Sequence, residues 1–246
     1  MSDAIAALSD AMRNDSETLR VIGQNVANID TVAYRREIAV TRASFDQVAD
    51  QIADQVADQA RAEIAAPTQH ETVIDQRAGT LKSSSEPLNL ALEGPGFFVV
   101  ETPDGGGEAL TRRGDFRLDN DGRLVTQQGL PVLGKNGAVH LAGTPQIAAD
   151  GTVRVAGEVV TQLRIAQVSP ESKLTPLGAD LYGGAQLSQD DSSARVRQGF
   201  LETSNVDSVQ EMLRLIETMR HFEGVQRFVR GYDDMMSKAI SELGKV

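Results

Sequence analysis

The residues with the clearest potential for metal chemistry form one acidic turn. Asp119-Asn120-Asp121-Gly122 looks like the opening of a calcium-binding loop. A full loop of that kind also needs an acidic residue at position 117 and a carboxylate at position 128. Those positions hold Arg117 and Gln128. We therefore interpret the segment as the turn of a β-hairpin.

The sequence contains no other pattern that indicates catalysis or metal binding. Nucleophile-elbow, phosphate-loop and dinucleotide-binding motifs are absent from it. Carboxylates such as Glu86 and Glu93 could form a glycosidase pair, but their spacing supplies no geometry for one. The histidines lack the spacing of a metal site: His70, His140 and His221. We predict that the protein is not an enzyme and has no catalytic, metal-binding or cofactor-binding residues.

A second acidic feature is a four-residue repeat, Gln-Val/Ile-Ala-Asp, between Phe45 and Ile64. Helical spacing places its Val, Ile and Ala residues on one face and its Asp residues in a row. Carboxylates stacked along a helix do not surround one cation, so a calcium-binding ladder is the less favoured interpretation. We predict a helix with its apolar face packed on protein and its Asp row in solvent.

Composition excludes several function classes. The 246 residues carry a formal net charge of -11, whereas sequence-independent binding of nucleic acid needs clustered Lys and Arg. The chain has no cysteine, so it forms neither disulfides nor thiolate metal sites. No apolar run approaches the roughly 18 residues that span a bilayer. The first ten residues also lack the basic and apolar regions of a secretory signal. We expect no nucleic-acid binding, no direct membrane insertion and no cleaved signal peptide.

The elements that organise the chain are two helices with apolar seams, one at each end. The first is expected over residues 3 to 28 and the second over residues 206 to 243, with Ser204 or Asn205 as the N-cap of the second. Asp15 interrupts the 3-4 spacing of the first seam. A narrow seam buries little area alone, so each helix needs a partner. The candidate assembly residues are Ile5, Leu8, Met12, Leu19, Ile22, Asn25, Val26 and Asn28 in the first helix, and Leu215, Phe222, Val225, Val229, Tyr232, Met236 and Leu243 in the second.

Between the helices, short apolar runs alternate with Gly-containing turns, which predicts a compact antiparallel sheet, sandwich or barrel. The expected fold class is therefore α+β, with long N- and C-terminal helices pairing as a coiled-coil-like inner domain and with a central antiparallel β domain. We expect four segments: the N-terminal helix and turn (1–44), the Asp-rich repeat helix and linker (45–80), the β domain (81–187), and a linker with the C-terminal helix (188–246).

Four segments, in order along the chain, carry a family resemblance. They are Gly23-Gln-Asn-Val-Ala-Asn-Ile-Asp-Thr-Val-Ala-Tyr-Arg35; Leu88-Asn-Leu-Ala-Leu-Glu-Gly-Pro-Gly-Phe-Phe-Val-Val100; Thr111-Arg-Arg-Gly-Asp-Phe-Arg-Leu118 with its continuation to Gly134; and Gln198-Gly-Phe-Leu-Glu-Thr-Ser-Asn-Val-Asp207 with Glu211-Met212 and Arg220-His-Phe-Glu223. Together they resemble the flagellar rod and hook family, the axial proteins of the bacterial flagellar basal body. Within that family, the chain length and the Gly94-Pro95-Gly96-Phe97 turn favour a proximal rod subunit, then a distal one, and a hook subunit least.

The resemblance implies an assembly in which the terminal helices form an inner tube and the β domain an outer layer. It implies export without a cleaved signal peptide through the flagellar export apparatus. The implied partners are copies of the chain and other rod and hook proteins. The rod would span the periplasm, transmit torque and conduct exported subunits.

One departure from the family pattern affects the first turn. Ala33 stands where the family has glycine, and alanine resists a positive φ. The sequence leaves open whether this turn keeps the family conformation.

Two other functions remain open at this point. The β domain could be a secreted hydrolase that the helices oligomerise, or the chain could be a soluble chaperone-like or regulatory coiled-coil protein. An oligomeric enzyme should have its terminal helices formed in the isolated protein, whereas a rod subunit should order them on assembly.

Overall fold

The computed structural model describes residues 2–43, 68–102, 104, 107–168, 174–178, 180–183, 187–188 and 193–243. The Asp-rich repeat of residues 45 to 64 lies outside them. Two compact units form the fold. The helical unit is formed by the described residues within 1–27, 37–75 and 207–246, and the β unit by those within 28–36 and 76–206. The folding of residues 81–187 on their own stays a prediction.

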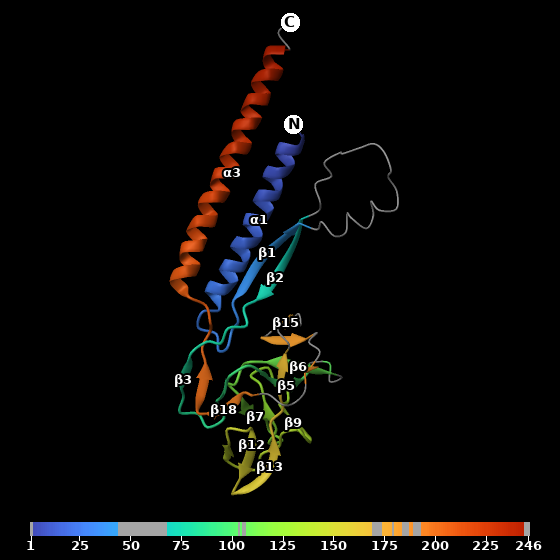
Figure 1. The fold of residues 1–246 in the computed structure, drawn as a ribbon, viewed down its shortest axis with the longest axis vertical. Helices are drawn as coiled ribbons and strands as arrows, with labels where there is room; N and C mark the ends of the chain where they lie inside the picture. Colours follow the sequence, from blue (N-terminus) through green and yellow to red (C-terminus); the bar gives the residue numbers. More distant parts are fainter. Residues whose placement is uncertain are drawn as a thin grey trace, which may run out of the picture. The chain divides into compact units, whose positions relative to one another are not determined.

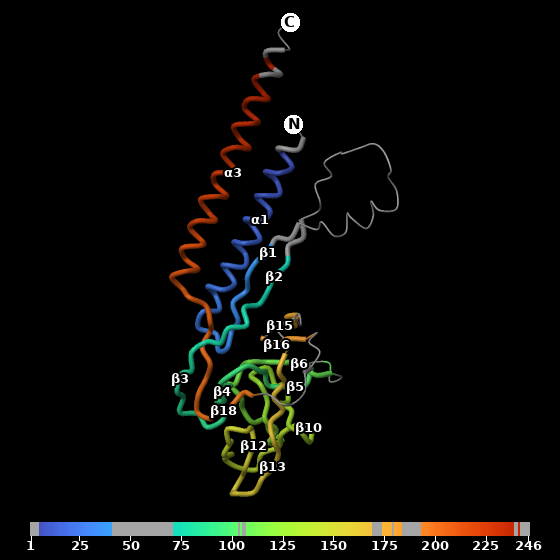
Figure 2. The backbone as a smooth tube through the Cα atoms, in the orientation of Figure 1, coloured from blue at the N-terminus to red at the C-terminus, as the bar shows by residue number. Residues whose placement is uncertain are grey.

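The helical unit consists of two long helices and a two-stranded sheet. Helix α1 (Ser2–Ala27) and helix α3 (Ser208–Leu243) run antiparallel and side by side, as Figures 1 and 2 show. Strands β1 (Glu37–Ala43) and β2 (Thr68–Ile74) pair antiparallel, and β1 packs against α1. Both terminal helices expected from the sequence are confirmed. Neither helix, within the described residues, has an apolar stretch long enough to cross a bilayer.

The start of α3 corrects one prediction. Its N-cap is Asp207, whose Oδ1 accepts hydrogen bonds from the backbone N–H groups of Val209 (2.9 Å) and Gln210 (3.2 Å). Ser204 and Asn205 do not serve as the cap, because their side chains bind elsewhere. Ser204 Oγ accepts from the N–H of Val206, and Asn205 Oδ1 accepts from the N–H of Arg36. A capping carboxylate also suits the positive end of the helix dipole.

The β unit is built from short antiparallel strands. A six-stranded sheet has the order β15-β16-β6-β5-β14-β17, and a three-stranded sheet has the order β11-β12-β13. The last two strands return to the first ones, since β18 pairs with β4 and β19 with β3. The strands are β3 (Leu81–Ser83), β4 (Leu90–Glu93), β5 (Phe97–Glu101), β6 (Glu108–Thr111), β7 (Arg117–Leu118), β8 (Leu124–Val125), β9 (Leu133–Gly134), β10 (Gly137–Ala138), β11 (Pro145–Ile147), β12 (Thr152–Val155), β13 (Glu158–Gln162), β14 (Ile165–Val168), β15 (Thr175–Gly178), β16 (Leu181–Gly183), β17 (Leu187–Ser188), β18 (Arg195–Gln198) and β19 (Phe200–Glu202).

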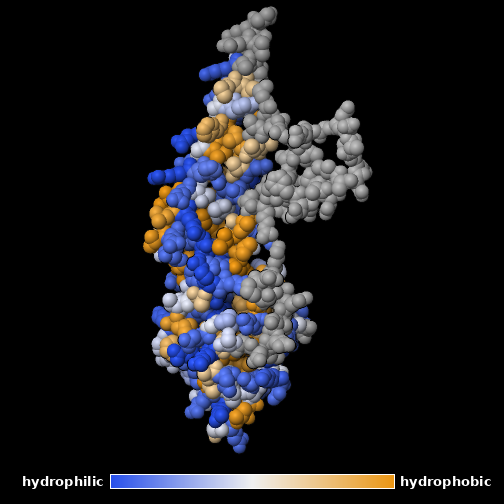
Figure 3. Space-filling view, in the orientation of Figure 1, coloured by the Kyte–Doolittle hydropathy of each residue, from blue (hydrophilic) through white to orange (hydrophobic). Residues whose placement is uncertain are grey.

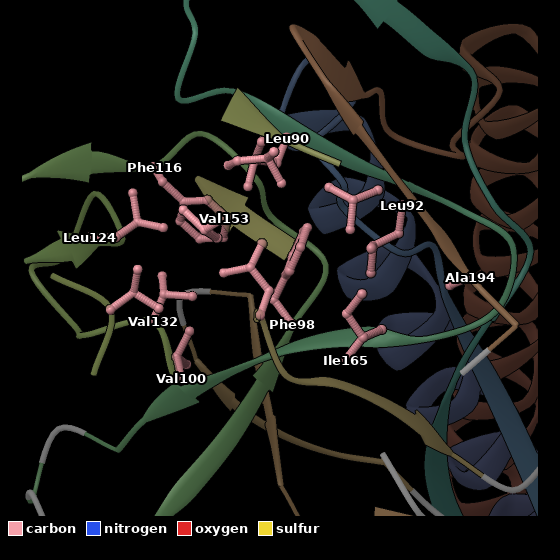
Figure 4. Close-up of a cluster of buried hydrophobic side chains, with 14 of the residues drawn as sticks. Leu90, Leu92, Phe98, Val100, Phe116, Leu124, Val132, Val153, Ile165 and Ala194 are labelled. Carbon is pink, nitrogen blue, oxygen red and sulfur yellow. The ribbon is translucent and has the colours of Figure 1, made fainter. Parts of the chain in front are cut away.

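One apolar core holds these strands together. Phe98 and Phe116 meet edge to face, with their ring centroids 5.2 Å apart. Leucine and valine side chains from several strands surround them, and Figure 4 shows this cluster. Phe98, Val100, Leu124 and Val132 are fully buried, so the β unit has a hydrophobic core of its own.

The hairpin turn predicted from the acidic segment is confirmed. β7 and β8 pair on either side of it, with Arg117 opposite Val125. Asp119 Oδ1 accepts from the backbone N–H groups of Asp121 and Arg123, and Asp119 Oδ2 lies 2.7 Å from Arg123 Nε. These hydrogen bonds hold the pKa of the Asp119 carboxyl below its ordinary value, although burial opposes the shift most strongly. The carboxylate therefore stabilises the turn.

Candidate functional site

Two polar contacts set the register between α1 and α3. Asp15 Oδ2 lies 2.7 Å from His221 Nδ1, and Asn25 Nδ2 lies 3.4 Å from Glu211 Oε2. Ten residues separate the two positions on each helix, as an antiparallel register requires. The same register places Leu8 opposite Phe228 and Ser2 opposite Asp234. Residues 235 to 243 of α3 therefore extend past the start of α1.

Asn25 also ties α1 to β1. Its Oδ1 accepts from the N–H of Glu37, and its Nδ2 donates to the carbonyl of Glu37, both at 2.8 Å. The amide thus pairs with the strand backbone as another strand would. Asn25 and Glu211 are almost completely buried, so this polar cluster belongs to the interior of the helical unit.

The structure places the predicted seam residues at different depths. Ile22, Asn25 and Val225 are buried in the helical unit. Asn28 belongs to the β unit, where its Oδ1 accepts from Thr31 Oγ1. Ile5 and Met236 are exposed, and the Leu243 side chain lies outside the described residues. The others are partly buried: Leu8, Met12, Leu19, Val26, Leu215, Phe222, Val229 and Tyr232.

Pairing with α1 leaves much of the apolar surface of α3 exposed. Phe228 is 72% exposed and Val209 is 65% exposed. Figure 3 shows hydrophobic side chains gathered on the surface of the helices. The exposed apolar residues of α3 include Val209, Met212, Leu213, Ile216, Met219, Phe228 and Met235. Large exposed apolar patches are typical of interaction surfaces.

The β unit contains a buried ion network that sequence reasoning missed. Glu202 Oε1 lies 2.9 Å from Arg35 Nη2, and Glu202 Oε2 lies 2.6 Å from Arg112 Nε. Arg112 also donates to the backbone carbonyls of Leu92 and Gly94 at 2.7 Å and to that of Gly96. The three charged side chains are at most 3% exposed. One carboxylate serves two guanidinium groups, so one positive charge is left over, and these carbonyl dipoles stabilise it by accepting hydrogen bonds.

This network joins parts of all four segments that carry the family resemblance. Arg35 ends the first segment, Leu92 to Gly96 lie in the second, Arg112 lies in the third and Glu202 in the fourth. The sequence offered no usable signal for this network, because a charged residue beside apolar strand residues, such as Glu202 after Phe200-Leu201, is ordinarily placed on the solvent face of a strand.

The turn that contains Ala33 keeps a positive φ. Ala33 has a φ of 56° and is 1% exposed, and its N–H donates to the carbonyl of Glu202 at 2.8 Å. Asn205 holds the next residues, because its N–H donates to the carbonyl of Tyr34 and its Oδ1 accepts from the N–H of Arg36. These contacts maintain a conformation that glycine would adopt without strain.

The described residues contain no group of three or more His, Asp or Glu side chains placed to hold a metal ion. The buried charged side chains among these residues form ion pairs or hydrogen bonds with other side chains and with the backbone.

Two family models and several known proteins are similar to this chain. Residues 197–242 match the family described as flagellar basal body rod FlgEFG protein C-terminal, and residues 91–161 match the flagellar hook protein FlgE/F/G D1 domain. The chain is similar to the flagellar basal-body rod protein FlgF of Rhizobium meliloti (strain 1021), with 32% identity over 97% of this chain and 96% of that protein. It is also similar to the flagellar basal-body rod protein FlgG of Bacillus subtilis (strain 168), with 30% identity over 94% and 95%. The chain belongs to the flagellar basal-body rod protein family.

Proposed function

We propose that this chain, a structural subunit of the flagellar basal-body rod, polymerises through α1 and α3 into the rod tube. The observation that carries the proposal is the apolar surface of α3, which remains exposed after α3 has paired with α1. A subunit that forms a tube needs such a surface on its helices, because each helix must pack against neighbouring copies as well as against its own partner.

The finer parts of the proposal rest on the family to which the chain belongs. The two helices pair in a coiled-coil-like manner and form the inner layer of the tube, and the β unit forms the outer layer. The partners are copies of the chain, other rod and hook proteins, and the flagellar export apparatus. The tube transmits torque and conducts exported subunits across the periplasm.

The family consists of structural proteins, not enzymes, and no relative supports the hydrolase alternative. Rod proteins of both the FlgF and the FlgG type match at similar identity. The proximal position in the rod therefore stays a prediction.

A charge placed in the seam tests the proposal. Leu19→Asp puts a carboxylate at a partly buried seam position, where it costs free energy unless it finds a partner. We expect cells that carry this variant as their only copy to lack complete rods in electron micrographs of basal bodies. The matched control is Arg13→Asp at an exposed position of α1, which should leave rods intact. Normal rods with Leu19→Asp would refute assembly through this seam.

A further inference from the structure

Methionine is the only source of sulfur in this chain, because the sequence has six methionines and no cysteine. Four of them lie on the surface of α3, with between 39% and 64% of each residue exposed. We call them the α3 methionines: Met212, Met219, Met235 and Met236. Met12 of α1 is half-buried, and Met1 lies outside the described residues. In the described part of the chain, exposed methionine is therefore confined to α3.

The α3 methionines belong to the exposed apolar surface of this helix. Met212 and Met219 are seven residues apart, which is about two helical turns, so they lie on one face. Ile216 lies between them on that face and is exposed as well. Met235 lines an apolar groove of about 560 Å³ together with Phe228. Side chains as exposed as these are open to small solutes from the solvent.

The thioether of an exposed methionine is oxidised by peroxides. Its sulfur attacks one oxygen of hydrogen peroxide, the O–O bond breaks and an S–O bond forms. The departing hydroxide takes up the proton of the transferred hydroxyl and leaves as water. The sulfur is thereby oxidised by two electrons and the peroxide is reduced, so the product is methionine sulfoxide.

A sulfoxide changes the surface on which it forms. It converts a flexible apolar side chain into a polar, chiral one, which disrupts methionine-rich interfaces. A polar group that is buried without a hydrogen-bond partner costs free energy. Because the α3 methionines remain exposed after α3 has paired with α1, their oxidation changes the outer surface of the helical unit and not its interior.

We propose that the α3 methionines are oxidation sites of the unassembled chain, and that their oxidation by peroxide blocks incorporation into the rod. This inference rests on the proposed function, because it requires the α3 surface to become buried between subunits. That burial excludes peroxide, so an incorporated chain keeps these methionines reduced. The chain has no cysteine thiol of its own to reverse the reaction. Recovery of an oxidised chain therefore requires a methionine sulfoxide reductase.

Peptide mapping by mass spectrometry tests the sites. In the full-length chain treated with hydrogen peroxide, the α3 methionines should be oxidised as fast as in the same chain unfolded in urea, and the half-buried Met12 more slowly. In purified basal bodies, the same treatment should leave the α3 methionines reduced. Oxidation of Met12 as fast as the α3 methionines in the folded chain would overturn the assignment of the sites. Oxidation of the α3 methionines in basal bodies at the rate of the free chain would overturn their protection by assembly.

Leucine substitutions test the block on incorporation. Leucine keeps the apolar volume of methionine and removes the reactive sulfur. The combined variant Met212→Leu, Met219→Leu, Met235→Leu and Met236→Leu should enter basal bodies at the same level with and without sublethal peroxide. The wild-type chain should fall about tenfold under peroxide, the equivalent of one unfavourably buried polar group. The matched control Met12→Leu should fall as the wild type does, because its α3 methionines remain.

The outcomes separate this inference from the proposed function. An equal peroxide-dependent loss of the wild type and the combined leucine variant would overturn the inference and leave the rod function standing. Absence of the wild-type chain from basal bodies without peroxide would overturn both.

A polar substitution tests the block without peroxide. Met212→Gln together with Met219→Gln places neutral polar side chains on the α3 surface, as oxidation does. We expect this double variant to be incorporated about tenfold less than the wild type, whereas Met212→Leu together with Met219→Leu should be incorporated normally. Normal incorporation of the glutamine variant would show that the assembled rod tolerates polar groups at these positions, and would overturn the block.

Discussion

Asp15 Oδ2 lies 2.7 Å from His221 Nδ1, a contact between residues 206 positions apart in the chain. Asp15 is the residue that interrupts the apolar seam of α1, and its side chain is 9% exposed. The interruption therefore has a structural role, because a polar contact between a buried Asp15 and a mostly exposed His221 at the edge of the helix interface favours one register over others. The Asn25–Glu211 contact fixes the same register at the other end of α1.

Removing the partner of Asp15 should destabilise the helix pair. His221→Ala leaves a buried carboxylate without that hydrogen bond, and we expect the free energy of unfolding to fall by about 1 kcal/mol. Asp15→Leu restores the apolar seam and should be at least as stable as the wild type. Urea unfolding followed by circular dichroism measures both. A stable His221→Ala together with a destabilised Asp15→Leu would show that the pair contributes nothing to the interface.

Neutralising Glu202 should destabilise the β unit strongly. Glu202→Gln leaves Arg35 and Arg112 buried without their shared carboxylate, which costs about 3–5 kcal/mol. The control is Glu108→Gln, which removes a more exposed ion pair with Arg164 and should cost less than about 1 kcal/mol. Urea unfolding followed by tyrosine fluorescence reports both changes. Equal effects of the two substitutions would contradict the role given to the network.

Relieving the strained turn should stabilise the chain. Ala33→Gly removes the cost of a positive φ, and we expect the free energy of unfolding to rise by up to about 1 kcal/mol. The exposed Ala156, with a φ of 52°, should respond in the same direction to Ala156→Gly. Ala6→Gly, at an exposed helical position, should instead lower stability by about 1 kcal/mol. Loss of stability in both positive-φ variants would show that neither turn is strained.

Burial raises the pKa of the Glu37 carboxyl, and nearby Arg20 only partly opposes this effect. The folded chain therefore binds this proton more tightly than the unfolded chain. The stability that Glu37 contributes is present below its ordinary pKa and is lost as the pH rises through its raised value. Glu37→Gln should thus gain stability relative to the wild type at pH 7 but not at pH 4, measured as urea midpoints. The same difference at both pH values would contradict this assignment.

Periodic and local features of the fold could be predicted from the sequence. The 3-4 spacing of apolar residues predicted both α1 and α3, with ends within two residues of the observed ones. The turn residues Asp119 to Gly122 predicted the β7–β8 hairpin. Both signals act over a few residues, so the sequence displays them directly.

Features that depend on distant partners could not be predicted. The cap of α3 was missed because Ser204 and Asn205 have side chains suited to an N-cap. In the structure, Asn205 Oδ1 instead accepts a hydrogen bond from the N–H of Arg36, which is distant in the sequence. The Glu202 network was missed because a charge in the sequence does not name its partner. Pairing of β18 with β4 and of β19 with β3 likewise has no local signature.

The amount of this chain that co-purifies with basal bodies tests assembly through the terminal helices most directly. Val229→Asp places a charge in the partly buried seam of α3, whereas Val159→Asp places the same charge at a 61% exposed position of the β unit. Immunoblots of purified basal bodies should show Val159→Asp at the wild-type level and no Val229→Asp, with both variants exported equally from cells that lack a rod. Incorporation of Val229→Asp at the wild-type level would contradict assembly through these helices.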